Sequence, residues 1–197
     1  EYLLFLNNDV EIITGSWLEE MLQLCQQKDV GMVGAKLYYP DDTIQHAGVV
    51  VGLGGVAAHV LCKLPRDAEG YMGRLRCVQE ISAVTAACMM VKTSVFKAVG
   101  GFDEELKVAF NDIDLCMKVR KYGVKIVFTP YAELYHYESK SRGMEDTPEK
   151  QLRFSREVNC FRRKWERELL KGDPYYNPNL TLNNTDCSLR KQEKNGD

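Results

Sequence analysis

The chain has 197 residues, of which 45% are hydrophobic and 27% charged, so it can build one globular domain with a core. Its net charge of −2 provides no basic surface field, which argues against a nucleic-acid partner. No apolar run approaches the roughly 20 residues that cross a bilayer, so we expect no transmembrane segment. Seven scattered cysteines without a CxxC pair predict reduced thiols in a cytosolic protein.

The first apolar run, Tyr2–Leu6, is followed directly by Asn7, Asn8 and Asp9. This pattern predicts a central parallel strand, buried on both faces, with polar side chains at its carboxyl end. The polar triplet suits either a turn or a divalent-metal site, because Mg²⁺ is commonly held by carboxylates and substrate phosphates. Because the chain opens at such a strand, we expect it to begin inside a larger domain.

Helical and strand patterns alternate in the next segments. A capping box at residues 16–19 predicts a helix, and residues 30–37 predict a buried strand in which Gly31 and Gly34 permit close packing. This β-α-β order predicts a parallel sheet with right-handed crossovers.

The middle of the chain is rich in glycine and small residues. Residues 52–55 predict a hairpin between two short strands, and the polar residues 63–76 predict a mobile loop. Residues 84–91 predict a buried strand with small residues at its centre. Thr93 then suits the N-cap of a short helix that ends at Val99.

Two acids and a histidine follow in residues 110–139. Asp112 and Asp114 open an amphipathic helix, residues 124–128 predict a buried strand stopped at Thr129, and His136 ends a second apolar run. Ligands of open α/β sheets bind where strand ends face helix N-termini, so these residues could form a site. Asp112 could equally be a helix cap, Asp114 an ion-pair partner of the residue four positions later, and His136 a surface histidine.

The C-terminal part contains one long helix. The basic residues 139–143 suit either a phosphate clamp or a solvated loop. Thr147 and Pro148 predict the start of a helix over about residues 147–171, and we expect its apolar stripe to pack against the core or a partner. From residue 183 to 197 the chain is polar, and we expect a disordered tail.

Seven motifs in this order carry a resemblance to a known family: LFLNNDVEI, HAG, SAVTAACMMV, VGGFDEEL, FNDIDLCMKVRKYG, LYHYES and DPYYNPNL. Over residues 2–182 the chain resembles the C-terminal two-thirds of a family 2 glycosyltransferase of the rhamnosyltransferase-like bacterial type. The resemblance implies an α/β GT-A fold, a Rossmann-like mixed sheet flanked by helices. It implies a partial domain over residues 1–182 that lacks the N-terminal nucleotide-binding half.

The resemblance also assigns roles to residues. Asn7, Asn8 and Asp9 stand where the family has its DXD motif, so Asn7 and Asn8 would contact the donor and Asp9 would hold Mn²⁺ or Mg²⁺. Asp112 matches the catalytic base, and His136 matches a histidine that completes the metal shell in some relatives. The segment Gly101, Phe102, Asp103 and Glu104 matches the lining of the acceptor side.

This set implies a metal-dependent, inverting hexosyltransferase that moves a sugar from a nucleotide diphosphate sugar to a glycan or lipid-linked acceptor in polysaccharide synthesis. One base without a second catalytic carboxylate implies a single displacement, whereas a glycosidase needs two. We expect a cytoplasmic location, either free or peripheral at the inner membrane face. We also expect weak activity of this chain alone, and a symmetric dimer that covers the exposed sheet edge. The alternative is a non-catalytic segment that binds glycan or protein.

Overall fold

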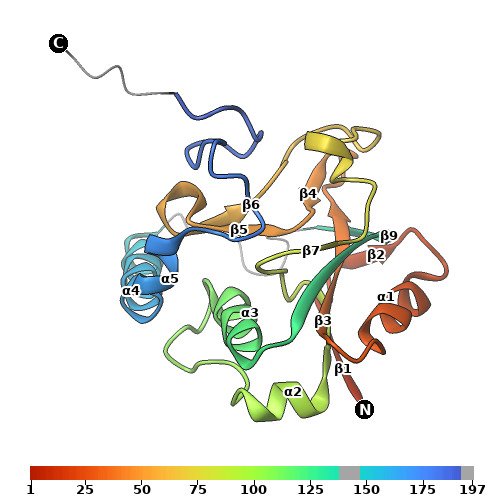
Figure 1. Cartoon of the computed structure of the whole chain (residues 1–197), viewed down its shortest axis with the longest axis horizontal. Coiled ribbons are helices and arrows are strands. Elements are labelled where there is room, and N and C mark those ends of the chain that lie inside the picture. The colour runs from red at the N-terminus through yellow and green to blue at the C-terminus, as the bar shows by residue number, and fades with distance from the viewer. Residues whose placement is uncertain (138–146, 192–197) are drawn as a thin grey trace.

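The computed structural model describes residues 1–137 and 147–191, and a mixed seven-stranded sheet forms its centre (Figure 1). The strands follow the order β1-β8-β3-β9-β2, while β4 pairs with β3 and β7 pairs with β9. A separate two-stranded sheet joins β5 to β6. The strands are β1 (Tyr2–Leu6), β2 (Val10–Ile12), β3 (Val30–Tyr38), β4 (Ile44–His46), β5 (Val49–Val51), β6 (Ala57–His59), β7 (Gln79–Glu80), β8 (Cys88–Lys92) and β9 (Lys125–His136).

Strand β1 forms an edge of this sheet and not its centre, which corrects our expectation. It pairs only with β8, in antiparallel orientation, and Leu4 and Leu6 stay 37% and 41% exposed. Because β8 is antiparallel to both β1 and β3, the latter two strands run in the same direction, as the β-α-β order predicts. Strand β8 lies between them, however, so the sheet is mixed and not parallel.

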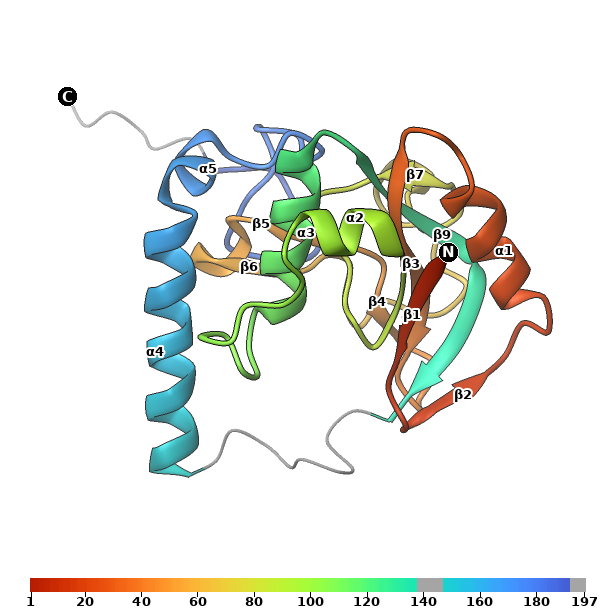
Figure 2. The same ribbon diagram turned by 90° about the horizontal axis from the view of Figure 1, so that it is seen from below.

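Helices cover both faces of the sheet (Figure 2). Helix α1 (Trp17–Cys25) packs on one face, whereas α2 (Thr93–Ala98) and α3 (Asn111–Tyr122) pack on the other. Helix α4 (Pro148–Lys164) forms a further layer outside α3 and continues into α5 (Glu166–Lys171). The predicted long helix is therefore interrupted, at Trp165.

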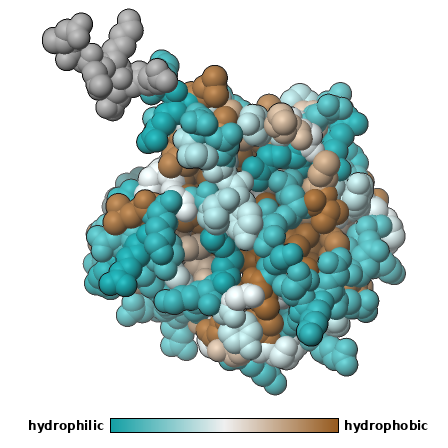
Figure 3. Space-filling view, in the orientation of Figure 1, coloured by the Kyte–Doolittle hydropathy of each residue, from teal (hydrophilic) through white to brown (hydrophobic). Residues whose placement is uncertain are grey.

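Two apolar clusters fill the spaces between these layers. The smaller one joins Trp17, Met21 and Cys25, the buried residues of α1, to the sheet. The larger one joins the opposite face of the sheet to α3 and α4. In it, Phe161 and Trp165 of the predicted stripe are fully or almost fully buried, at 0% and 4% exposed. The outward side of α4 and α5 is mostly hydrophilic, so the stripe packs into the core (Figure 3).

Several element boundaries differ from those predicted. Ser16 makes no capping hydrogen bond through its side chain, and Thr93 is the first residue of α2, not its cap. Of these three predicted N-caps, Thr147 is the one that caps its helix, since its side chain accepts a hydrogen bond from the amide of Lys150 at 3.3 Å. Strand β8 begins at Cys88, so residues 84–87 form a connecting segment that leads to the site described below.

Strand β9 continues through Thr129 and Pro130, where the sequence predicted its end. The pairing with β3 shifts here, because Phe128 faces Gly34 whereas Glu133 faces Lys36. The β9 residues between Phe128 and Glu133 outnumber their β3 partners and form an irregularity like a β-bulge. Pro130 lies in this irregular part, so its missing N–H interrupts no regular row of hydrogen bonds between the strands.

The residues after α5 fold back over β5 and β6 (Figure 1). The amide of Gly54 donates to the Leu182 carbonyl at 2.8 Å, and the amide of Leu61 donates to the Thr185 carbonyl at 2.6 Å. The expected disorder is therefore wrong for residues 183–191, while residues 192–197 lie outside the described part. The polar loop 63–76 is also tied to the molecule, since its Leu75 is 1% exposed.

Gly34 offers a direct test of the packing between β3 and residues 84–87. A Cβ atom at this position would lie 2.3 Å from Cγ1 of the buried Val84. We therefore expect Gly34→Ala to lower the free energy of unfolding by about 1–3 kcal/mol, measured by chemical denaturation. Gly15→Ala is the matched control, because open space surrounds the Cβ position there. Equal stabilities of the two variants would contradict the close approach.

Candidate active site

The predicted site residues come from three elements that meet at one edge of the sheet. Asn7, Asn8 and Asp9 follow the carboxyl end of β1, His136 ends β9, and Asp112 lies in the first turn of α3. The pairing of β2 with β9 places Val10 opposite His136, and the amide of Tyr137 donates to the Asp9 carbonyl at 2.9 Å. The backbone thus fixes Asp9 beside His136.

The side chains of Asp9 and His136 form a partly buried pair. Oδ1 of Asp9 lies 3.3 Å from Nε2 of His136, and the two side chains are 13% and 11% exposed. Nδ1 of His136 donates to Oε1 of Gln45 at 2.8 Å, which leaves Nε2 as an acceptor. Nδ2 of Asn7 donates to this Nε2 at 3.0 Å. The single lone pair of Nε2 thus faces the Asn7 amide, and a cation held between Asp9 and His136 would replace this hydrogen bond.

Gln45 fixes the ring of His136 and was not predicted as a site residue. Its amide oxygen accepts from the ring, and its Nε2 donates to the His136 backbone carbonyl at 3.2 Å. Metal-binding histidines are commonly oriented by such a partner on the other ring nitrogen. No sequence signal links these residues, which are 91 positions apart.

The donor set of Asp9 and His136 suits Mn²⁺ or Mg²⁺ with substrate oxygens completing the shell. Among residues 1–137 and 147–191, no three His, Cys, Asp or Glu side chains gather as a complete metal site. Asp9 and His136 are the described side chains that could contribute ligands to a cation at this place.

Asp112 lies at the second position of α3, and the interpretation as N-cap is wrong. Phe110 precedes the helix instead, with a left-handed φ of 63° and no side-chain cap. Oδ2 of Asp112 accepts from the amide of Ala86 at 3.1 Å, and Oδ1 accepts from the amide of Ile113 at 2.8 Å. The carboxylate is therefore oriented by two backbone donors and remains partly exposed.

The segment 85–87 connects the two halves of the site. While Ala86 donates to Asp112, the carbonyl of Ala87 accepts from the amide of Asn7 at 3.0 Å. Neighbouring peptide groups thus hold the proposed base and the polar turn after β1. The structure brings Asp112 and Asn7 to the same segment, and the side chain of Asn7 in turn contacts His136.

His46 supports this segment and was not predicted as a site residue. Its Nε2 accepts from the amide of Thr85 at 3.5 Å, and its ring packs edge-on against His59. Burial, and next the neighbouring His59, hold the pKa of His46 well below its usual value, so the ring is neutral at pH 7. A pocket of about 310 Å³ lies beside it, lined among others by Gln45, His59, Thr85, His136 and Thr185.

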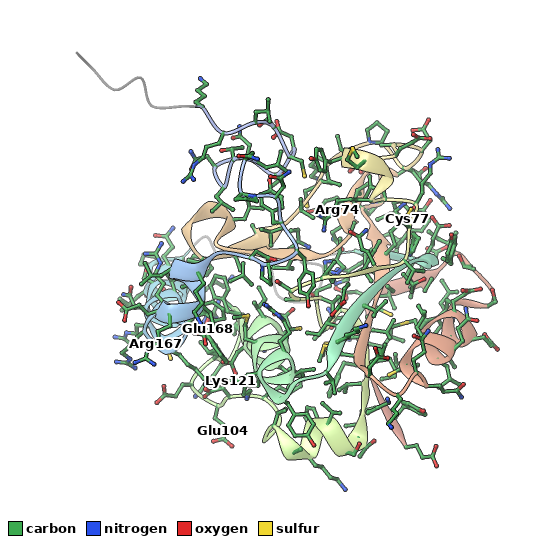
Figure 4. All side chains as sticks on the ribbon, in the orientation of Figure 1. Arg74, Cys77, Glu104, Lys121, Arg167 and Glu168 are labelled. Atoms are coloured by element: carbon green, nitrogen blue, oxygen red, sulfur yellow. The ribbon has the colours of Figure 1, made fainter. Side chains whose placement is uncertain are left out.

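The segment 101–104 contributes to packing and to ion pairs. The ring of Phe102 meets that of Phe5 edge-on at 5.0 Å, and Asp103 pairs with Lys164 of α4. A hydrogen bond from Lys164 lowers the pKa of Asp103. Glu104 lies at the outer surface (Figure 4). The role of Gly101 to Glu104 in acceptor binding stays a prediction.

Asp114 is fully buried and serves the packing of α3. It accepts a hydrogen bond from Nε1 of Trp165 at 2.8 Å and pairs with Lys164 at 2.8 Å. Lys118 lies 3.2 Å from its second oxygen, which confirms the predicted pair one turn apart. Asp112 and Asp114 therefore have different surroundings, and only Asp112 reaches the segment shared with Asn7.

The arrangement of sheet and helices is that of a GT-A glycosyltransferase. The solved structure "Crystal structure of GalNAc-T7 with UDP, GalNAc and Mn2+" superposes with a TM-score of 0.59 and 13% identity, over 86% of this chain and 32% of that chain. This likeness confirms the predicted fold.

The family follows from the sequence comparisons. The profile described as "Glycosyltransferase like family 2" matches residues 3–156, and the chain belongs to this family. The "Uncharacterized protein y4gI" of Sinorhizobium fredii is 57% identical over 96% of the chain, and the "O-antigen biosynthesis protein RfbC" of Myxococcus xanthus is 41% identical over 100%. The chain spans 21% and 15% of these two proteins.

A shorter match concerns an enzyme of known donor type. The "N-acetylglucosaminyl-diphospho-decaprenol L-rhamnosyltransferase" of Mycobacterium tuberculosis is 36% identical over 62 residues, which cover 32% of this chain and 20% of that protein. Within the described residues, every helix is too short or too polar to cross a membrane.

Because Asp114 is buried with two lysines, we expect removal of its charge to destabilise the fold. Asp114→Asn leaves Lys164 and Lys118 without their common buried partner, so we expect unfolding to become easier by about 3 kcal/mol in chemical denaturation. Asp67→Asn is the control, because this carboxylate is exposed. If both variants unfold at the wild-type denaturant concentration, the buried pairs do not stabilise the docking of α4 and α5.

Proposed function

We propose that this chain forms the catalytic part of an inverting, metal-dependent glycosyltransferase. It would transfer a hexose from a nucleotide diphosphate sugar to a glycan or lipid-linked acceptor during cell-surface polysaccharide synthesis. One observation carries the proposal: Asp112, and the Asn7 turn that leads to Asp9 and His136, are held by the adjacent residues Ala86 and Ala87. This common support is what favours Asp112 as the base beside a cation held by Asp9 and His136.

Asp9 and His136 are the residues that would hold a divalent cation, and Asn7 and Asn8 would contact the donor. The hydrogen bond to Gln45 keeps the proton on Nδ1 of His136, so Nε2 could bind the cation once its hydrogen bond from Asn7 is released. A cation bound there with the diphosphate would offset the negative charge that develops on the leaving phosphate.

Asp112 would take the proton of the attacking acceptor hydroxyl. Its carboxylate is oriented by the amides of Ala86 and Ile113, and each oxygen keeps a lone pair for a further hydrogen bond. Attack from the side opposite the leaving diphosphate inverts the anomeric carbon in one displacement. A second catalytic carboxylate is not needed for such a reaction, whereas glycosidases use two.

The names of the relatives support the class of acceptor. One relative acts in O-antigen biosynthesis and another transfers rhamnose to a diphospho-decaprenol-linked sugar, so a cell-surface glycan or its lipid-linked precursor is the favoured acceptor. The segment Gly101 to Glu104 would line the acceptor side. The enzyme would work in the cytoplasm or at the inner membrane face. The symmetric dimer through the edge of β1 also belongs to this proposal.

A non-catalytic binding segment is the competing function. Metal-dependent release of nucleotide diphosphate from a panel of nucleotide sugars would favour the enzyme and identify its donor. Glycan binding that persists after chelation of metal, without any release, would favour the binding segment.

Asp112→Asn separates the base from a purely structural carboxylate. The amide keeps the size and one acceptor oxygen but cannot take up the proton, so we expect turnover of the complete polypeptide to fall about 10²- to 10⁴-fold. Stability should stay near that of the wild type, in contrast to Asp114→Asn. Turnover close to wild type in a donor-release assay would show that Asp112 is not the base.

Asp9→Asn tests the cation site by a binding measurement as well as by activity. The variant lacks the anionic ligand, so we expect weaker Mn²⁺ binding in calorimetry and loss of metal-stimulated turnover. Asp67→Asn, which removes an exposed carboxylate elsewhere, should leave both unchanged. Mn²⁺ affinity equal to wild type in Asp9→Asn would exclude Asp9 as a ligand.

A further inference from the structure

Glu157 of α4 is a buried carboxylate without a place in the site described so far. It is 3% exposed, and its oxygens accept from three consecutive backbone amides. Oε1 accepts from Lys107 and Val108 at 3.1 Å each, and Oε2 accepts from Ala109 at 2.9 Å. Arg153, one turn earlier on α4, lies 3.8 Å from Oε2.

The three amides belong to a segment that has no regular structure of its own. Residues 99–110 connect α2 to α3 without forming helix or strand, so the amides of residues 107–109 have no partner in a regular helix or strand. Figure 2 shows that part of this connection lies between α3 and α4. A single ionised carboxylate satisfies three amides at once, and hydrogen bonds to a charged acceptor are stronger than neutral ones.

Aromatic contacts of the same helix face fix the end of this connection. Phe110 contacts Phe154 and Phe161 at ring distances of 5.8 Å and 5.4 Å. Phe154, Glu157 and Phe161 are spaced by three and four residues, so they share one face of α4. Phe110 also adopts a left-handed conformation, which is unfavourable for a bulky residue and persists only where its surroundings hold it.

Asp112 follows two residues after Phe110. The first hydrogen bond of α3 joins the amide of Asp114 to the carbonyl of Phe110 at 2.8 Å, so the direction of this helix depends on how Phe110 is held. The bond from Ala86 to Oδ2 of Asp112 requires α3 to start at the observed place. A shift of the segment 107–110 would therefore move the carboxylate of Asp112.

We infer that Glu157 is a positioning residue for the base: it holds the segment 107–109 so that Asp112 faces the acceptor hydroxyl. The inference rests on the function proposed above. It requires that Glu157 affects turnover at saturating substrate more than it affects donor binding, because the cation and donor residues belong to the other half of the site. If Glu157 were needed only for folding, its replacement would lower stability without affecting turnover more than donor binding.

Glu157→Gln is the test, with Glu149→Gln in the exposed first turn of α4 as matched control. Glutamine keeps the volume but turns an amide group toward backbone N–H groups. In the complete polypeptide we expect kcat to fall about 10- to 100-fold, the cost of a small displacement of a reacting group. KM for the donor should stay within about twofold. The control should change neither value.

Hydrogen exchange provides a readout that does not depend on activity. The amides of Lys107, Val108 and Ala109 should exchange faster in Glu157→Gln, while those in the middle of α3 remain protected. Unchanged exchange at these amides would overturn the inference. So would faster exchange with kcat equal to that of the control, or a joint loss of stability, kcat and donor affinity.

Phe154→Leu serves if Glu157→Gln fails to fold. Phe154 is 40% exposed, so its replacement should preserve the fold while loosening Phe110. We expect a smaller fall of kcat in the same direction, and an unchanged kcat would overturn the inference. A wild-type protein without transfer of any sugar would instead refute the proposed function, and the exchange experiment would still decide whether Glu157 holds the segment.

Discussion

The buried carboxylate of Asp114 determines how the C-terminal helices dock on the rest of the domain. A charge inside the protein is tolerated only with partners, and Asp114 takes them from its own helix and from the junction of α4 and α5. Lys164 also reaches Asp103, so the connection after α2 joins the same cluster. Once α4 is fixed in this way, its inner face lies against the residues that precede Asp112.

The segment 84–87 places a second constraint on the site. Val84 approaches Gly34 so closely that a side chain at position 34 would clash with it. Ala86 and Ala87 use their backbone groups to hold Asp112 and Asn7. The run of small residues in this segment also fits the buried strand that the sequence predicts here.

The family resemblance in the sequence was sufficient for the fold class, and local patterns predicted most of the elements. The structure also brings the predicted residues Asn7 and Asp9 close to His136, whereas their roles stay predictions. The failures of the sequence predictions have physical causes. The position of β1 at an edge depends on β8, which comes from a distant part of the chain and inserts between β1 and β3. The continuation of β9 beyond Pro130 depends on an irregular pairing with β3 that local propensity cannot reveal. Gln45 and Glu157 act through partners that are far away in sequence, so no motif indicates them. His46 belongs to the HAG motif, but its contact with Thr85 depends on the fold.

The two halves of the site are supported by different parts of the domain. Asp9 and His136 depend on the pairing of β2 with β9 and on Gln45, whereas Asp112 depends on α3 and on the contacts of α4. The halves meet at Ala86 and Ala87, where one residue donates an amide hydrogen to one half and the next offers a carbonyl to the other. The sheet alone could therefore assemble the proposed cation ligands, whereas the position of the proposed base also depends on how the C-terminal helices are docked.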